Sequence, residues 1–111
     1  MNIKKEKISD FSVIHVDGRI DTINSTTLET ELDQLHNRGE MKIIIDCGDV
    51  KYISSSGLRI FLNAQKKSIT SHGKLVLCSL PLPIREIFDI SGFSSIFSIY
   101  NTLEEAVDQK K

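Results

Sequence analysis

Three consecutive serines followed by a glycine, Ser54-Ser55-Ser56-Gly57, are the residues of this chain best suited to chemistry. A serine hydroxyl can accept a phosphoryl group, serve as a nucleophile or cap a helix. The apolar run Ile43–Ile45 precedes the serines and an amphipathic pattern begins at Leu58, which predicts a strand, a serine turn and a helix. The free N–H groups and positive dipole end of that helix favour a phosphate. The pattern therefore indicates a modification site on a small binding domain rather than a catalytic centre.

The partners that a catalytic serine needs are not evident. His15 is expected in mid-strand, and His36 and His72 near helix ends, so none pairs with a serine and a carboxylate as a hydrolase requires. The Gly-x-Ser-x-Gly elbow is missing, and so is the phosphate-binding Gly-x-x-x-x-Gly-Lys-Ser/Thr loop. We therefore expect no enzymatic activity, no catalytic residue and no cofactor.

The two cysteines, Cys47 and Cys78, lie in separate apolar runs without Cys-x-x-Cys spacing. Buried, reduced core cysteines are the simplest interpretation. Two cysteines and three scattered histidines show no ligand spacing, so no metal site is predicted.

Length and composition describe one ordinary globular domain spanning residues 1–111. Hydrophobic residues make up 40% of the chain and charged residues 26%, with a net charge of -1, so nothing favours nucleic acid or an anionic membrane. No apolar run approaches the roughly 18 residues that span a bilayer, and no apolar segment follows the charged start as in a secretory signal. We expect a cytoplasmic protein and, by default, a monomer.

Alternating patterns in the first half predict a hairpin and then a helix. Ile3–Ile8 and Phe11–Val16 read as strands joined by a turn at Ser9-Asp10, and 17–21 as a loop. The helix that follows has several N-cap candidates from Asn24 to Thr27, a capping-box spacing and an apolar face, and it ends at a glycine. These features are carried by Thr26 and Glu29, by Leu28, Leu32 and Leu35, and by Gly39.

The second half continues the alternation. Strands are expected at Met41–Asp46, Lys74–Cys78 and Ile96–Ile99. Helices are expected from Leu58 to Ile69, from Pro83 to Gly92 and after Thr102, where Glu105 completes a second capping box. The stripe predicted to pack in the first of these helices comprises Leu58, Phe61, Leu62, Gln65 and Ile69. Residues 108–111 are expected to fray.

Strands that alternate with helices from residue 11 onward predict an α/β fold. Right-handed crossovers would give a mixed, mostly parallel sheet of about five strands with about four helices packed on it.

Three blocks, with the spacing between them, give the chain a family resemblance. They are Val16–Asp21, Ile43–Cys47 and, most strongly, Val50–Leu58. Together they resemble the STAS domain family, the bacterial anti-sigma factor antagonists, along nearly the whole chain.

The resemblance implies a partner-switching protein. In that family the serine two residues before the glycine is phosphorylated, which corresponds here to Ser55; an aspartate often precedes it, where this chain has Ser54. The unphosphorylated form would bind an anti-sigma factor that is also a serine kinase, and phosphorylation would release it. A serine phosphatase would reset the cycle. An adaptor subunit of a larger signalling or transport assembly, without sigma-factor control, is the alternative.

Several residues near the serines are candidates for partner contact, each with a simpler structural interpretation. They are Asp21, Ser54, Ser56, Gly57 and Arg59. Asp21 could instead cap its loop, Ser54 and Ser56 could cap the helix or its turn, and Gly57 could be a packing glycine. Arg59, together with Lys66, could simply be a solvated face of the helix. Tyr52 is expected to anchor the loop by packing its ring.

Overall fold

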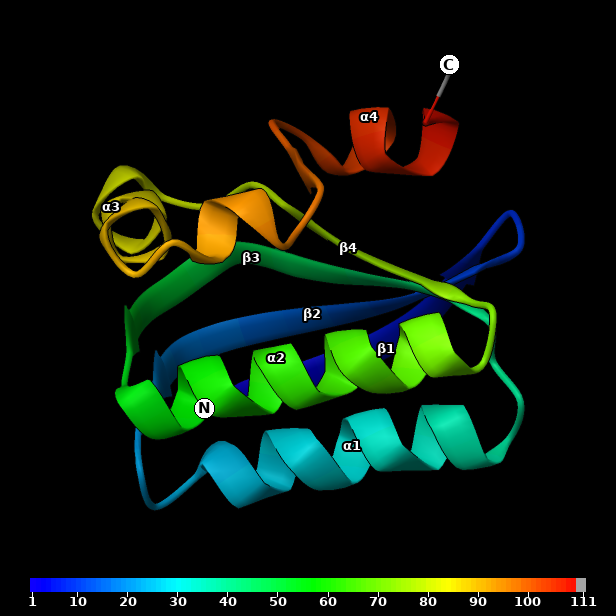
Figure 1. Ribbon diagram of the computed structural model, residues 1–111, viewed down its shortest axis with the longest axis horizontal. Coiled ribbons are helices and arrows are strands. Elements are labelled where there is room, and N and C mark those ends of the chain that lie inside the picture. The colour runs from blue at the N-terminus through cyan, green and yellow to red at the C-terminus, as the bar shows by residue number, and fades with distance from the viewer. Residues whose placement is uncertain (110–111) are drawn as a thin grey trace.

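Strands and helices alternate as expected in a computed structural model that describes residues 1–109 (Figure 1). The strands are β1 (Asn2–Ile8), β2 (Phe11–Ile20), β3 (Lys42–Ile53), β4 (Lys74–Cys78) and β5 (Ile99–Tyr100). The helices are α1 (Ser25–Asn37), α2 (Ser55–Thr70), α3 (Leu82–Ile90) and α4 (Leu103–Asp108), with a 3₁₀ turn at Phe93–Ser95. The strand order is β1-β2-β3-β4-β5, antiparallel between β1 and β2 and parallel elsewhere, which confirms the predicted mixed α/β sheet.

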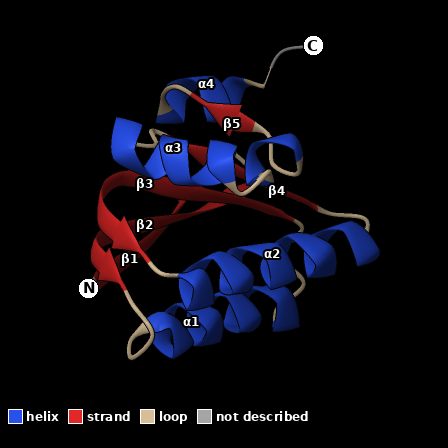
Figure 2. Cartoon of the chain, turned by 60° about the vertical axis from the view of Figure 1, so that its left-hand side comes forward, coloured by secondary structure: helices blue, strands red, loops and turns tan. Residues whose placement is uncertain are grey.

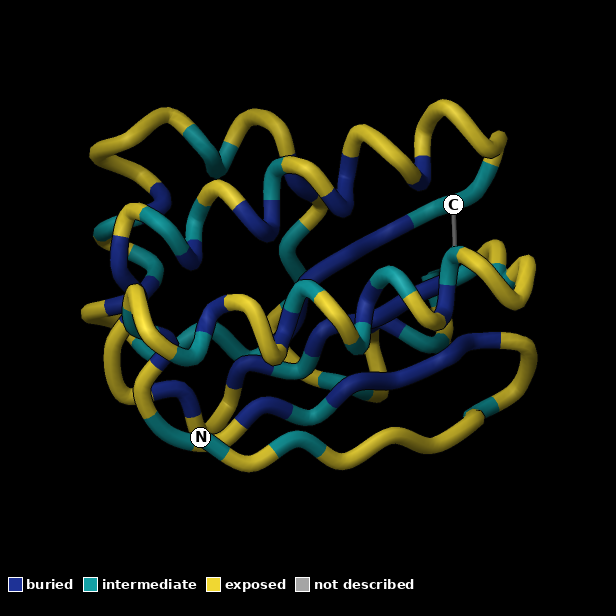
Figure 3. The backbone as a smooth tube through the Cα atoms, turned by 90° about the horizontal axis from the view of Figure 1, so that it is seen from below, coloured by how far each residue is buried: buried dark blue, intermediate teal, exposed yellow. Residues whose placement is uncertain are grey.

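The helices cover both faces of the sheet. Helices α1 and α2 lie side by side beneath it and α4 lies above, as Figures 1 and 2 show from two directions. The larger core cluster joins α1, α2 and α3 to one face of the central strands; the smaller one joins α4 to the other face through Phe11, Val13, Ile44 and Ala106. Figure 3 shows the central strands buried and the stretch that follows the N-terminus largely exposed. Within residues 1–109, no helix combines the length and the apolar character that a bilayer crossing requires.

Strands β2 and β3 are both longer than predicted, and this is the main correction to the fold. The predicted ends were Val16 and Asp46, but pairing continues to Ile20 and Ile53. The register shifts twice on the way, once on each side of Gly18, whose φ of +105° is a conformation that glycine adopts without strain. The segment 17–21, predicted to be a loop, is therefore mostly strand. Its pairing with β3, some thirty residues further along the chain, outweighs the turn preference of its polar residues.

The helix ends follow local rules, with one exception. Gly39 ends α1 at a φ of +77°, and Thr102 Oγ1 accepts the N–H of Glu105 at 3.1 Å, as expected of a capping residue. Of the N-cap candidates from Asn24 to Thr27, Asn24 is the one that precedes α1, and the capping-box spacing of Thr26 and Glu29 is not used because both residues lie inside the helix.

Three further details differ from the sequence pattern. In α2, Phe61 and Gln65 are buried, but Ile69 is 63% exposed because the true packing stripe runs through Ile60, Phe61 and Ala64. The last strand is Ile99–Tyr100 rather than Ile96–Ile99, because a 3₁₀ turn takes up the preceding residues. Of the expected frayed end, Asp108 closes α4 and Gln109 accepts a hydrogen bond from Lys74 Nζ at 2.8 Å, while 110–111 lie outside the described residues.

Both cysteines are free and buried in the core, as predicted. Burial raises the pKa of the Cys47 thiol well above its ordinary value and that of Cys78 to about 11. Thiols that stay protonated in this way are poor nucleophiles, so the pair has a packing role.

Candidate functional site

The serine turn, Ser54–Gly57, joins the end of β3 to the start of α2, and Ser54 is its anchor. The Ser54 Oγ accepts the backbone N–H of Gly57 at 3.1 Å, so Ser54 is the N-cap of α2. Its own N–H donates to the carbonyl oxygen of Ile20 at 2.8 Å, which ties the end of β2 to the turn. The side chain is 8% exposed. Of the three hydroxyls, that of Ser54 is therefore already engaged in structure.

Ser55 stands at the first position of α2 with an exposed side chain, and Ser56 follows half-buried. Within residues 1–109, the backbone N–H groups of these two serines have no protein acceptor. An anion on the Ser55 hydroxyl would lie beside free donors and at the positive end of a helix of 16 residues. Ser55 is thus the accessible serine of the turn.

Gly57 is held in close packing. A Cβ built at this position would lie 2.7 Å from Ile20 Cγ2 and 2.9 Å from Ile53 Cγ1, well inside van der Waals contact. Both isoleucines are buried at the ends of β2 and β3. The glycine therefore lets the first turn of α2 approach the sheet, and that approach sets where the serines emerge.

Asp21 caps the loop between β2 and α1. Its Oδ1 accepts the N–H groups of Ile23 at 3.0 Å and Asn24 at 2.9 Å. Asn24 returns the contact: its Oδ1 accepts the N–H of Asp21 at 2.8 Å, and its Nδ2 donates to the Arg19 carbonyl at 2.8 Å. The result is a braced loop beside the serine turn, with Ile23 89% exposed at its tip.

The sequence pattern does not indicate Ile23 or Arg19 as part of the site, and it indicates Asn24 only as one of several N-cap candidates. An isolated isoleucine in a polar loop carries no pattern, because its exposure depends on how the loop is folded. Arg19 places its guanidinium 4.3 Å from the ring centre of Tyr52, across the extended β2–β3 pairing. This contact shows what the Tyr52 ring packs against. The sequence pattern places both residues in loops and therefore does not predict it.

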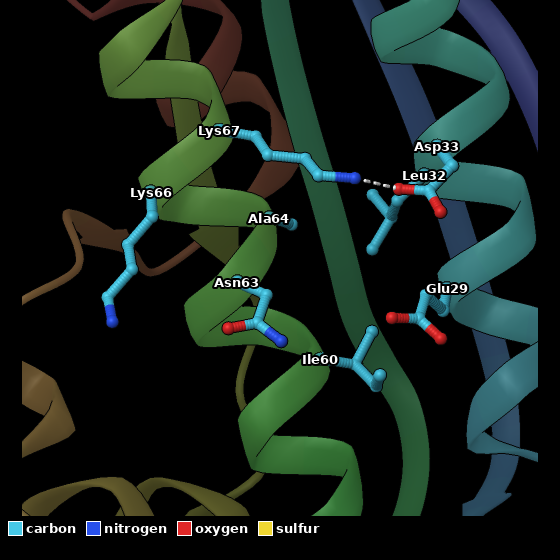
Figure 4. A pocket seen from close by; sticks show the side chains of 8 residues that line it. All are labelled: Glu29, Leu32, Asp33, Ile60, Asn63, Ala64, Lys66 and Lys67. Carbon is cyan, nitrogen blue, oxygen red and sulfur yellow. Dashed lines mark hydrogen bonds and ion pairs between the residues drawn. The ribbon is translucent and has the colours of Figure 1, made fainter.

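Arg59 and Lys66 are both exposed on α2. In Figure 4, Lys66 points away from α1, whereas its neighbour Lys67 reaches across to Asp33 Oδ1, at 2.6 Å. That ion pair spans a groove of about 290 Å³ between α1 and α2, with Leu32, Ile60 and Ala64 among its lining residues. The groove therefore lies between the two helices, and no residue of the serine turn lines it.

The histidines are occupied or remote. His15 contacts Glu6 and Asp46 on the sheet, and His36 Nε2 lies 2.9 Å from Ser68 Oγ. His72 follows the far end of α2, about 24 Å along the helix from Ser55. None of the three histidines is therefore placed at the serine turn by these contacts.

The chain matches the STAS domain family model over residues 2–106. BtrV of Bordetella bronchiseptica, named as a candidate anti-sigma factor antagonist, is 39% identical over 96% of this chain and 91% of its own. The anti-sigma-B factor antagonist of Listeria monocytogenes is 32% identical over 91% of each chain.

Solved structures share the fold at lower identity. A candidate anti-sigma factor antagonist from Thermotoga maritima superposes with a TM-score of 0.92 at 22% identity, covering 96% of this chain and 92% of that one. The anti-sigma factor antagonist SpoIIAA gives TM-scores of 0.77 unphosphorylated and, for the Bacillus protein, 0.78 phosphorylated, at 19% and 21% identity. Each match covers 97% of this chain, and 96% and 98% of theirs. The chain therefore belongs to the STAS domain family, among relatives named as anti-sigma factor antagonists.

Proposed function

We propose that this protein is an anti-sigma factor antagonist whose binding to an anti-sigma factor is switched by phosphorylation of Ser55. The proposal rests on one difference within the serine turn. The Ser54 hydroxyl is hydrogen-bonded as the helix cap, while Ser55 is exposed at the first helical position. The names of the relatives supply the class of partner.

The chemistry of the turn supports a phosphoserine that leaves the domain folded. A phosphate adds about -1.5 to -2 charges and three strong acceptors. The free N–H groups of Ser55 and Ser56 and the dipole of α2 favour that charge by about 0.3–1 kcal/mol at an exposed site. The effect of the phosphate would fall on the partner, because a dianion buried against a complementary surface loses its hydration.

The partner would contact the serine turn together with its surroundings. Ser56 and Gly57 lie within the turn, the Asp21 loop presents Ile23 beside it, and Arg59 follows one turn along α2. In this proposal the partner is a serine kinase that uses its own ATP to modify Ser55, and a serine phosphatase restores the binding form.

The decisive experiment compares Ser55→Ala with Ser55→Asp in titrations against the anti-sigma factor kinase captured from the native cell. Ser55→Ala is expected to bind whether or not ATP is present. Ser55→Asp is expected to bind more weakly, and a loss of about 3 kcal/mol corresponds to more than a hundredfold in Kd. Ser56→Ala is the matched control and should still be released by ATP. Equal affinity of the two Ser55 variants would contradict the proposal.

Mass spectrometry of the protein from its native cell tests the modification independently. The expected result is a single phosphate on Ser55. A phosphate on Ser54 or Ser56 would move the site. Co-purification of a multi-protein scaffold or a transporter subunit, with no kinase, would favour an adaptor role instead.

A further inference from the structure

One imidazole on the sheet is held between two carboxylates from different strands. His15 of β2 places Nδ1 2.7 Å from Asp46 Oδ2 of β3 and Nε2 2.5 Å from Glu6 Oε2 of β1. Asp46 lies directly opposite His15 in the parallel pairing, and Glu6 lies diagonally across the antiparallel one. The three side chains therefore form a line that crosses three strands.

With both carboxylates ionised, this geometry fits a doubly protonated ring. A neutral imidazole carries one N–H, so only one carboxylate could receive a hydrogen bond and the other would face a lone pair. An imidazolium satisfies both, and each contact becomes a charge-assisted hydrogen bond.

The surrounding charges on this part of the sheet are mixed. Lys4 and Lys5 of β1 line the same surface hollows as His15, together with Asp17 of β2 and Asp49 of β3. The other oxygen of the Asp46 carboxylate accepts the N–H of Gly48 at 3.0 Å, which fixes that carboxylate on β3. The Asp46 side chain is 21% exposed and that of Glu6 is 50% exposed. Glu6 is therefore the looser of the two partners.

We propose that Glu6, His15 and Asp46 form a proton-dependent clasp that links the edge strand β1 to the central strand β3 and opens at Glu6 when His15 loses its proton. In this proposal the neutral ring keeps its proton on Nδ1 and donates it to Asp46, whose other carboxylate oxygen is held by the Gly48 N–H. The hydrogen bond between His15 Nε2 and Glu6 is the one that is lost, so the edge strand β1 loses this side-chain contact.

The direction of the pH dependence follows from the same contacts. Partial burial acts to lower the pKa of His15, but the hydrogen bonds to Glu6 and then Asp46 outweigh it, and the pKa lies above its ordinary value of 6.5. Since the folded pKa is raised, the stabilisation is complete below pH 6.5 and disappears as the pH rises through the higher folded value.

An NMR titration of the His15 ring tests the clasp directly. The expected result for the unmodified protein is a pKa above 6.5, which falls in Glu6→Gln and falls in Asp46→Asn. Glu6 is exposed, so its substitution should leave the fold intact. Glu86→Gln, which changes an exposed carboxylate on α3, is the matched control and should leave the His15 titration where it was.

Thermal unfolding supplies the second measurement. From roughly pH 6 to roughly pH 9 the midpoint of the unmodified protein should fall more steeply than that of His15→Gln, which lacks the titrating ring. A His15 pKa at or below 6.5, no response to Glu6→Gln, or the same pH slope in His15→Gln would overturn the clasp.

Discussion

At position 57 a single methyl group should be enough to disturb the serine turn. Alanine is a better helix former than glycine by about 1 kcal/mol. At Gly57, however, the added Cβ would meet Ile20 and Ile53 at 2.7 and 2.9 Å. We expect Gly57→Ala to lower the free energy of unfolding by about 1–3 kcal/mol, the usual cost of overpacking. Chemical denaturation measures it.

Ser56→Ala is the control for that substitution, since it changes the preceding residue of the same helical turn without adding volume. Its effect should stay within about 0.5 kcal/mol. A Gly57→Ala protein as stable as the unmodified one would mean that the helix can retreat from the sheet.

The departure from the family at Ser54 should not change stability, because serine can cap the helix as aspartate does. Serine and aspartate are comparable N-caps, so Ser54→Asp should keep the hydrogen bond from the Gly57 N–H. Ser54→Ala should cost about 1 kcal/mol of unfolding free energy. If denaturant titrations gave Ser54→Asp the same loss as Ser54→Ala, the cap would not explain why either residue suits this position.

The roles of the three serines could be predicted only in part. Spacing and family resemblance select Ser55, but which hydroxyl caps α2 depends on where β3 ends, and the sequence predicted that strand to stop at Asp46 instead of Ile53. Asp21 left two interpretations open for the same reason. Its hydrogen bonds to Ile23 and Asn24 now support loop capping, while partner contact remains a proposal.

Among the elements, those with a strong local pattern were the ones that could be predicted. The apolar runs of β3 and β4 and the leucine stripe of α1 are buried, and their hydrophobic pattern predicts this burial without knowledge of which elements they pack against. The extensions of β2 and β3 depend on each other across some thirty residues, so neither carries a local signal. Strand β5, with two residues, is too short for any periodicity.

Helix α3 is held through aromatic contacts, which yields a prediction about its docking. Phe88 is fully buried, and its ring centre lies 5.9 Å from those of both Phe61 and Phe97 in edge-to-face geometry. Phe88→Ala should cost about 3–5 kcal/mol in unfolding free energy. Phe93→Ala, at a partly exposed ring on the rim of the same cluster, should cost clearly less in the same denaturation series. Equal losses would mean that the cluster has no buried centre.

For the whole molecule, the proposed switch predicts a change of charge without a change of fold. Phosphorylation would take the net charge from -1 to roughly -3. A native gel should resolve the two forms, while amide hydrogen exchange in β2, β3 and β4 should be the same in both. Faster exchange throughout the sheet after phosphorylation would point to unfolding rather than to a surface switch.

The two edge strands of the sheet differ in a way that bears on self-association of the protein. One edge strand is β5, which offers only two residues for pairing with another chain. The other is β1, which is seven residues long and carries Lys4, Lys5 and Lys7. Lys5 and Lys7 are ion-paired with Glu31 and Glu40 of the same molecule, and lysines along an edge strand oppose its pairing with the edge of another copy. For a protein that exchanges partners, as the proposed switch requires, a lysine-lined edge strand would reduce competition from self-association.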